Sequence, residues 1–173
     1  MKKDNNTLIS PVSVMMALSM MGNGAKGETL AELEEVFGTT VENLDVYFWE
    51  YQARLPKGED YQLHIAKSIW INNDNHFSVN PDFIRENQNY YYAGIYKTHF
   101  NENALKHINQ WVEKNTKGMI TDMISEIPES TMMYMINALA FDAKWESPYR
   151  EYSVRTDTFT KENGETQEVS FMH

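Results

Sequence analysis

With 173 residues, of which 42% are hydrophobic and 13% aromatic, the chain can bury the core of about one domain, which excludes an intrinsically disordered protein. Its formal net charge of −10 repels phosphate backbones and argues against nucleic-acid binding. The absence of cysteine excludes disulfides, thiolate metal sites and cysteine nucleophiles.

No apolar run reaches the roughly 18 residues of a membrane span, so we expect no membrane-spanning segment. The N-terminal stretch imitates a secretory signal, with lysines before an apolar run and small residues at 22–25. Against a signal, the polar residues 4–6 separate the lysines from the apolar run, and Ser10-Pro11 is typical of a helix start.

Three helices are predicted in the first third of the chain. Ser10 is a good N-cap, and apolar residues then recur at helical spacing up to Gly22. Thr29 and Glu32 have the spacing of a capping box, which predicts a second helix that begins at Thr29 and ends at Gly38. Residues 41–55 carry an apolar face of helical period and predict the third helix.

The middle of the chain alternates between the two periods. Residues 61–71 alternate as a strand with both faces at least partly covered, and the asparagine-rich stretch at 72–75 predicts a turn. A fourth helix is predicted at 80–91, a short strand at 95–100, and a fifth helix from about 104 to Gly118.

The sequence pattern predicts three strands in the last third of the chain. Residues 132–141 are apolar except for Asn137, which predicts a strand in the middle of a sheet that is covered on both sides. Asn163-Gly164 predicts a two-residue hairpin turn between strands at 154–160 and 166–172.

One motif suggests an enzyme. Residues 22–27 spell G-x-G-x-x-G, the fingerprint of dinucleotide binding, and this alternative predicts that the chain binds NADH. The fingerprint requires a preceding strand, whereas a helical pattern precedes it here, which favours a glycine-rich turn between helices. Histidines at metal-binding spacing, a hydrolase elbow and a nucleophile with its base are all absent from the sequence, so neither enzyme activity nor a cofactor or metal is expected.

Asn137 is the one polar residue in the most apolar strand. A buried amide without partners costs about 1–3 kcal/mol, so we expect Asn137 to bond to specific groups, and the hydroxyls of Ser10 and Ser13 are candidates. An ordinary core asparagine with satisfied hydrogen bonds is the alternative.

Several ordered stretches carry a family resemblance: NTLISPVSV at 6–14, GAKGET at 24–29, INQWV at 108–112 with Gly118, NALAF at 137–141 with Trp145, and VSFM at 169–172. Over nearly all of the chain after residue 5, this order of motifs resembles the serpin family. In this alignment the glycine motif becomes the turn between two helices.

The resemblance implies an α+β fold, the N-terminal half of a serpin. Several helices would pack on a central β-sheet whose third strand is about residues 131–144, and a hairpin would follow at about 154–172. Residues 1–173 would form a single incomplete serpin domain. A serpin offers a reactive loop to a serine protease and, once cut, inserts that loop into the sheet as a new strand.

The resemblance also assigns roles to residues. Three would form the shutter beneath the sheet centre, where the strands must part: Ser10, Ser13 and Asn137. Three would belong to the helix that covers the sheet and moves during insertion: Asn109, Trp111 and Gly118. Trp145 would lie in the breach near the top of the sheet, where the loop first inserts.

The reactive loop and the second half of a serpin are absent from this sequence. We therefore expect the chain alone to be non-inhibitory, while its parent would be a suicide-type inhibitor that meets a serine protease through the missing loop. A non-inhibitory serpin with a carrier, chaperone or structural role is the alternative. Residues 132–141 would present an unpaired apolar edge, which predicts self-association or pairing with the missing half. The family analogy implies an extracellular location.

Overall fold

The computed structural model describes residues 9–55, 61–74 and 76–172, which belong to two compact units, Met1–Asp142 and Ala143–His173. In the larger unit, the described residues form three helices and then strands and helices in alternation: α1 Pro11–Gly22, α2 Gly27–Phe37, α3 Val41–Arg54, β1 Tyr61–Asn72, α4 Pro81–Tyr91, β2 Gly94–Thr98, α5 Glu102–Asn115 and β3 Met133–Ala143. In the smaller unit, a short 3-10 helix precedes two strands: η1 Glu151–Ser153, β4 Val154–Thr160 and β5 Thr166–Met172. The predicted α+β class is confirmed.

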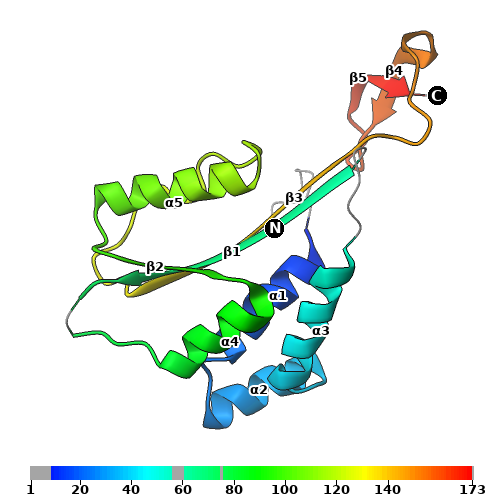
Figure 1. Cartoon of the computed structure of the whole chain (residues 1–173). Helices are drawn as coiled ribbons and strands as arrows, with labels where there is room; N and C mark the ends of the chain where they lie inside the picture. The colour runs from blue at the N-terminus through cyan, green and yellow to red at the C-terminus, as the bar shows by residue number, and fades with distance from the viewer. Residues whose placement is uncertain (1–8, 56–60, 75, 173) are drawn as a thin grey trace. The chain divides into compact units, whose positions relative to one another are not determined.

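The larger unit is built around a three-stranded sheet in the order β2-β1-β3. Strands β1 and β2 are parallel, with Ser68 opposite Gly94 and Trp70 opposite Tyr96. Figure 1 shows α5 on one face of this sheet and α1, α3 and α4 on the other. The sheet is therefore the middle layer of the unit.

The alternation of β1 fills both apolar layers. Ile69 and Ile71 pack with buried residues of α1, α3 and α4, whereas Trp70 packs on the opposite face with Ile108 and Val112 of α5. Burying one such side chain is worth about 1.5–3 kcal/mol, so each face of the strand contributes to folding. The prediction that both faces are covered is confirmed.

Among the described α-helices, all but α2 begin after an N-cap residue whose side chain accepts a hydrogen bond from the helix backbone. The Ser10 side chain accepts a hydrogen bond from the Ser13 N–H at 3.3 Å and caps α1 as predicted. The predicted capping box of Thr29 and Glu32 is wrong, because α2 begins two residues earlier, at Gly27, and its N-cap Lys26 makes no side-chain cap bond. Thr29 therefore lies inside the helix.

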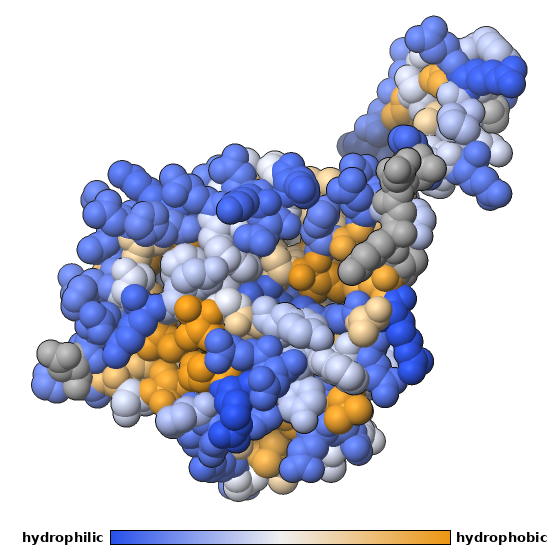
Figure 2. Space-filling view, in the orientation of Figure 1, coloured by the Kyte–Doolittle hydropathy of each residue, from blue (hydrophilic) through white to orange (hydrophobic). Residues whose placement is uncertain are grey.

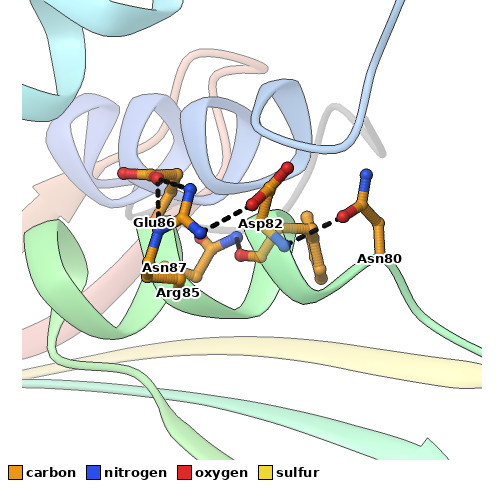
Figure 3. Close-up of polar contacts among 6 residues, drawn as sticks. Asn80, Asp82, Arg85, Glu86 and Asn87 are labelled. Atoms are coloured by element: carbon orange, nitrogen blue, oxygen red, sulfur yellow. Dashed lines mark hydrogen bonds and ion pairs between the residues drawn. The ribbon is translucent and has the colours of Figure 1, made fainter.

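Helix α4 is fixed by polar contacts at its start (Figure 3). The side chain of Asn80 caps the helix by accepting a hydrogen bond from the Asp82 N–H at 2.9 Å. The exposed Arg85 pairs with Asp82 at 2.6 Å and with Glu86 at 2.9 Å, which contributes little because water screens both pairs. The buried Asn87 amide donates to backbone oxygens of α4 and α1, at 2.9 and 3.2 Å, and ties the two helices together.

Strand β3 confirms the predicted strand but changes its setting. In the described part of the chain it lies at an edge of the sheet instead of in the middle, with β1 as its neighbour. Ile136, Ala138 and Ala140 are buried, whereas Phe141 is 64% exposed. An edge strand presents backbone N–H and C=O groups that have no partner strand.

The smaller unit contains the predicted hairpin, with Thr160 opposite Thr166 at its end. The predicted two-residue turn is wrong. The Lys161 N–H donates to Glu165 O at 2.8 Å and the Gly164 N–H donates to Lys161 O at 2.9 Å, which leaves a three-residue loop. Gly164 has φ +84°, so the loop is a turn followed by a left-handed residue, a conformation that suits glycine.

Candidate functional site beneath the edge strand

The amide of Asn137 clamps β3 onto the start of α1. Its Nδ2 donates to the Ser13 backbone oxygen at 2.6 Å and lies 3.2 Å from Ser13 Oγ. The two residues are 124 positions apart in the sequence, so this contact joins the first described helix to the last strand of the sheet. The expected bond from Asn137 to Ser13 is present.

Ser10 contributes to the clamp indirectly. Its hydroxyl caps α1 through the Ser13 N–H and makes no bond with Asn137 among those described, contrary to the direct bond that we considered. Ser13 is therefore held from both sides, by the cap on its N–H and by the amide on its carbonyl. Together, Ser10, Ser13 and Asn137 form the polar cluster that we call the amide clamp.

The acceptor end of the Asn137 amide is unused. Within the described residues its Oδ1 is buried and has no hydrogen-bond partner. A buried acceptor without a partner costs about 1–3 kcal/mol. Because most buried polar groups have a partner, the unbonded Oδ1 is unusual for a residue whose Nδ2 is well bonded. The clamp therefore has capacity for one further donor.

We expect Asn137→Ala to lower the free energy of unfolding by about 2 kcal/mol, because the variant loses the hydrogen bonds to Ser13 that tie β3 to α1. Urea unfolding followed by circular dichroism measures the change. Asn89→Ala on the exposed face of α4 is the matched control and should change the free energy by less than about 0.5 kcal/mol. Equal effects of the two substitutions would refute the clamp as a stabilising contact.

Asn109 lies on α5 and holds the segment that leaves this helix. Its Oδ1 accepts from the Met123 and Ile124 N–H groups, each at 3.0 Å, and its Nδ2 donates to Ile124 O at 2.8 Å. Gly118 lies beyond the end of α5 at φ +80°, with its N–H bonded to Glu113 O at 2.8 Å. Asn109 and Gly118, two of the three residues assigned to the covering helix, therefore fix the end of α5 and the segment that follows it.

Trp111, the third residue assigned to the covering helix, contacts the sheet at β2. Its Nε1 donates to the Tyr96 hydroxyl of β2 at 3.0 Å, and the two rings meet edge to face with centroids 6.4 Å apart. Sequence reasoning assigned Trp111 to this helix but missed Tyr96, whose position in a short strand gave no signal.

Trp145 belongs to the smaller unit. Its side chain is 68% exposed and lies edge to face with Tyr149, with the ring centroids 6.1 Å apart. Its assignment to the breach stays a prediction.

The alternation of side chains along β1 places Lys67 on a buried face, and sequence reasoning did not predict this burial. Lys67 is on the same strand face as Ile69 and is only 4% exposed. Its Nζ donates to Gln52 Oε1 of α3, and burial lowers the pKa of this lysine to about 8.

In α3, burial raises the pKa of the 4%-exposed Asp45, an effect that the neighbouring Tyr91 and Asn23 partly oppose.

An apolar groove of about 430 Å³ opens beside the start of β3. Its lining comes from α1, α2, α4 and β3 and from the loops before α2 and α4, and includes Met21, Leu33, Phe77, Phe83 and Met133. Apolar side chains also gather in patches on the surface of the larger unit in Figure 2. The groove holds no titratable side chain that could act in catalysis.

The described residues hold neither a candidate metal-binding cluster nor a helix that could span a membrane. They contain no group of three or more His, Asp or Glu side chains that could hold a metal ion. None of their helices is long and apolar enough to cross a membrane. The glycine motif at 22–27 lies between the helices α1 and α2, without the preceding strand that dinucleotide binding requires.

Comparisons with known proteins agree over the whole chain. The family model described as Serpin (serine protease inhibitor) matches residues 1–173. Neuroserpin from Homo sapiens is 30% identical over 179 residues, which cover 99% of this chain and 43% of neuroserpin. The native state of the thermophilic serpin tengpin matches with a TM-score of 0.92 at 41% identity, over 99% of this chain and 45% of tengpin.

A loop C-sheet serpin polymer matches equally well, with a TM-score of 0.92 at 42% identity, over 99% of this chain and 46% of that one. In each case the chain spans less than half the length of the relative that it matches. The family model covers every residue, and the structural matches confirm the fold that the motifs predicted. The chain therefore belongs to the serpin family of protease inhibitors and is not an enzyme.

Proposed function

We propose that this chain is the N-terminal half of a suicide-type inhibitor of serine proteases that works by inserting its cut reactive loop into the sheet. The observation that carries the proposal is the edge of β3, which has no partner strand beyond β1 among the described residues in the sheet order β2-β1-β3. A strand added there would satisfy the unpaired backbone groups of the edge, and main-chain hydrogen bonds would supply the energy.

The amide clamp supports this proposal. It ties the edge strand to α1, so any movement of β3 relative to the helices must break or carry along the Asn137–Ser13 bonds. The buried Oδ1 of Asn137 has no hydrogen-bond partner among the described residues, and the second half of the protein would supply the donor. We infer that Ser10, Ser13 and Asn137 act as the shutter that sets how easily the sheet opens, and that Trp145 belongs to the breach.

The proposal extends to domain organisation and partners. Both compact units would belong to one incomplete serpin domain covering residues 1–173, completed by a second half that carries the reactive loop. The partner of the whole protein would be a serine protease, encountered outside the cell. The chain alone would inhibit nothing, because the bait loop is not among its residues.

The test uses the full-length protein that contains this chain, incubated with trypsin-like, elastase-like and subtilisin-like proteases. We expect a covalent complex that survives SDS gel electrophoresis, formed by the full-length protein and not by residues 1–173 alone. Cleavage in the loop should also raise the melting temperature, because the inserted strand completes the sheet. Loop cleavage with neither complex nor stabilisation would overturn the proposal and favour a non-inhibitory serpin.

A further inference from the structure

Tyr96 of β2 lies between two tryptophans from different elements. Its ring stacks on Trp70 of β1, with centroids 4.3 Å apart and planes at 20°, and its hydroxyl accepts the hydrogen bond from Trp111 of α5 at 3.0 Å. The indole of Trp70 is buried and donates to the buried Ser68 hydroxyl at 2.9 Å. The base of this stack is therefore fixed in both position and orientation.

Gly94 provides the space for the Tyr96 ring. A Cβ at this position would lie 2.9 Å from the Tyr96 ring and 3.0 Å from its hydroxyl. Side chains two residues apart lie on the same face of a strand, so the ring folds back over the glycine. Any larger residue at position 94 would displace the ring from Trp70, from Trp111 or from both.

The two sides of α5 are held by different forces. Ile108 and Val112 of α5 belong to one apolar cluster with Trp70 of β1 and with Ile136 and Ala138 of β3, so the cluster contacts towards β3 are apolar packing. Towards β1 and β2, the directional stack of Trp70, Tyr96 and Trp111 adds a hydrogen bond to ring packing. Apolar packing tolerates sliding, whereas a hydrogen bond and stacked rings are lost when the partners shift by more than about 1 Å.

We propose that Trp70, Tyr96 and Trp111 form an aromatic latch that anchors α5 on the β1–β2 side of the sheet, with Tyr96 as its positioning residue. Because the latch holds α5 on the β1–β2 side, the contacts of α5 on the β3 side are the ones that break first. In the proposed inhibitor, the latch therefore sets how readily the covering helix clears the sheet when a strand is added at β3. This last step rests on the proposed function, whereas the anchoring of α5 does not.

The first experiment measures hydrogen exchange of the α5 amides in this chain. Tyr96→Phe removes only the hydroxyl and should speed exchange in α5 by about two- to tenfold, the loss expected for one exposed hydrogen bond. Gly94→Ala should have a larger effect on α5. Exchange in α1 and α4 should stay unchanged in Tyr96→Phe.

Tyr47→Phe is the matched control, because it removes a hydroxyl from a tyrosine that is 58% exposed on α3. It should leave exchange in α5 at the rate of the parent chain. If Tyr96→Phe also leaves α5 exchange at that rate, the latch is overturned, whether or not Gly94→Ala folds.

The second experiment measures the rate of loop insertion in the full-length protein after protease attack, from the fluorescence of a labelled loop. Tyr96→Phe should speed insertion by about the same factor as it speeds α5 exchange. Faster exchange with an unchanged insertion rate would overturn the role of the latch in insertion. If the full-length protein with Tyr96 intact traps no protease, the proposed function fails while the exchange data still decide on the latch.

Discussion

Replacing Lys67 by methionine is expected to raise the free energy of unfolding by about 1–3 kcal/mol at pH 7. The lysine is 4% exposed, and burial lowers its pKa from 10.5 to about 8. At pH 7 the folded state therefore holds a charged amine away from water, with Gln52 as its one described hydrogen-bond partner. Methionine keeps the length and apolar character of the stem without the charge.

The gain from Lys67→Met should depend on pH in a defined direction. The folded pKa lies below the unfolded value, so between about pH 8 and 10.5 the unfolded state binds more protons and the parent chain gains stability as the pH rises. A shift of this size corresponds to about 3 kcal/mol, since each pKa unit is worth about 1.4 kcal/mol. Above pH 10.5 the variant should therefore have no advantage, and the lost bond to Gln52 should leave it slightly less stable.

Chemical unfolding of both chains from pH 6 to pH 11 measures this difference, and other titrating groups cancel because both chains share them. Lys97→Met on the exposed side of β2 is the control and should change stability by less than about 0.5 kcal/mol at every pH. A constant advantage of Lys67→Met across the whole range would show that packing, and not the buried charge, accounts for the effect.

The amide clamp could be predicted because two independent signals in the sequence pointed to the same contact. A single amide in the most apolar strand demands partners, and Ser13 lies at the start of an apolar helix that needs a sheet to cover it. The direct bond from Ser10 was wrong because its hydroxyl already caps α1. Local capping by the nearer group competes with the long-range contact.

The misplaced elements have local causes. Helix α2 begins at Gly27, where the chain leaves a tight turn, so the capping signal at Thr29 was overridden by the turn before it. The hairpin turn was misjudged by one residue, because an Asn-Gly pair suits both a two-residue turn and a turn with a left-handed residue after it. In both cases several local conformations fit the same residues.

Lys67 and Tyr96 show what single-residue patterns miss. The period of β1 places Lys67 on the buried face, but a lysine is read as exposed unless the alternation is applied to it strictly. Tyr96 acquires its role only when β2 lies beside β1 and beneath α5, which depends on tertiary packing. The family motifs predicted the fold over nearly the whole chain, whereas these contacts arise only when elements distant in the sequence pack together.

We expect residues 1–173 to self-associate through the free edge of β3. The strand has no neighbour beyond β1 among the described residues, and its edge lies close to apolar surface that includes the groove at its start. Unpaired backbone groups next to apolar side chains favour pairing with a second strand. Analytical ultracentrifugation should therefore give an average mass that exceeds 20.2 kDa and rises with concentration.

Phe141→Lys tests where the contact lies, because Phe141 is 64% exposed on β3 and a lysine on an edge strand opposes pairing. The substitution should weaken association by about tenfold, since one charge that loses water in the paired state costs on the order of 1–2 kcal/mol. Val36→Lys is the matched control, as Val36 is 79% exposed on α2, away from the strand edges. Equal weakening by both variants would assign the effect to net charge. A monomer at every concentration would show that the isolated chain covers its own edge, and a free β3 edge could then no longer carry the proposed insertion mechanism.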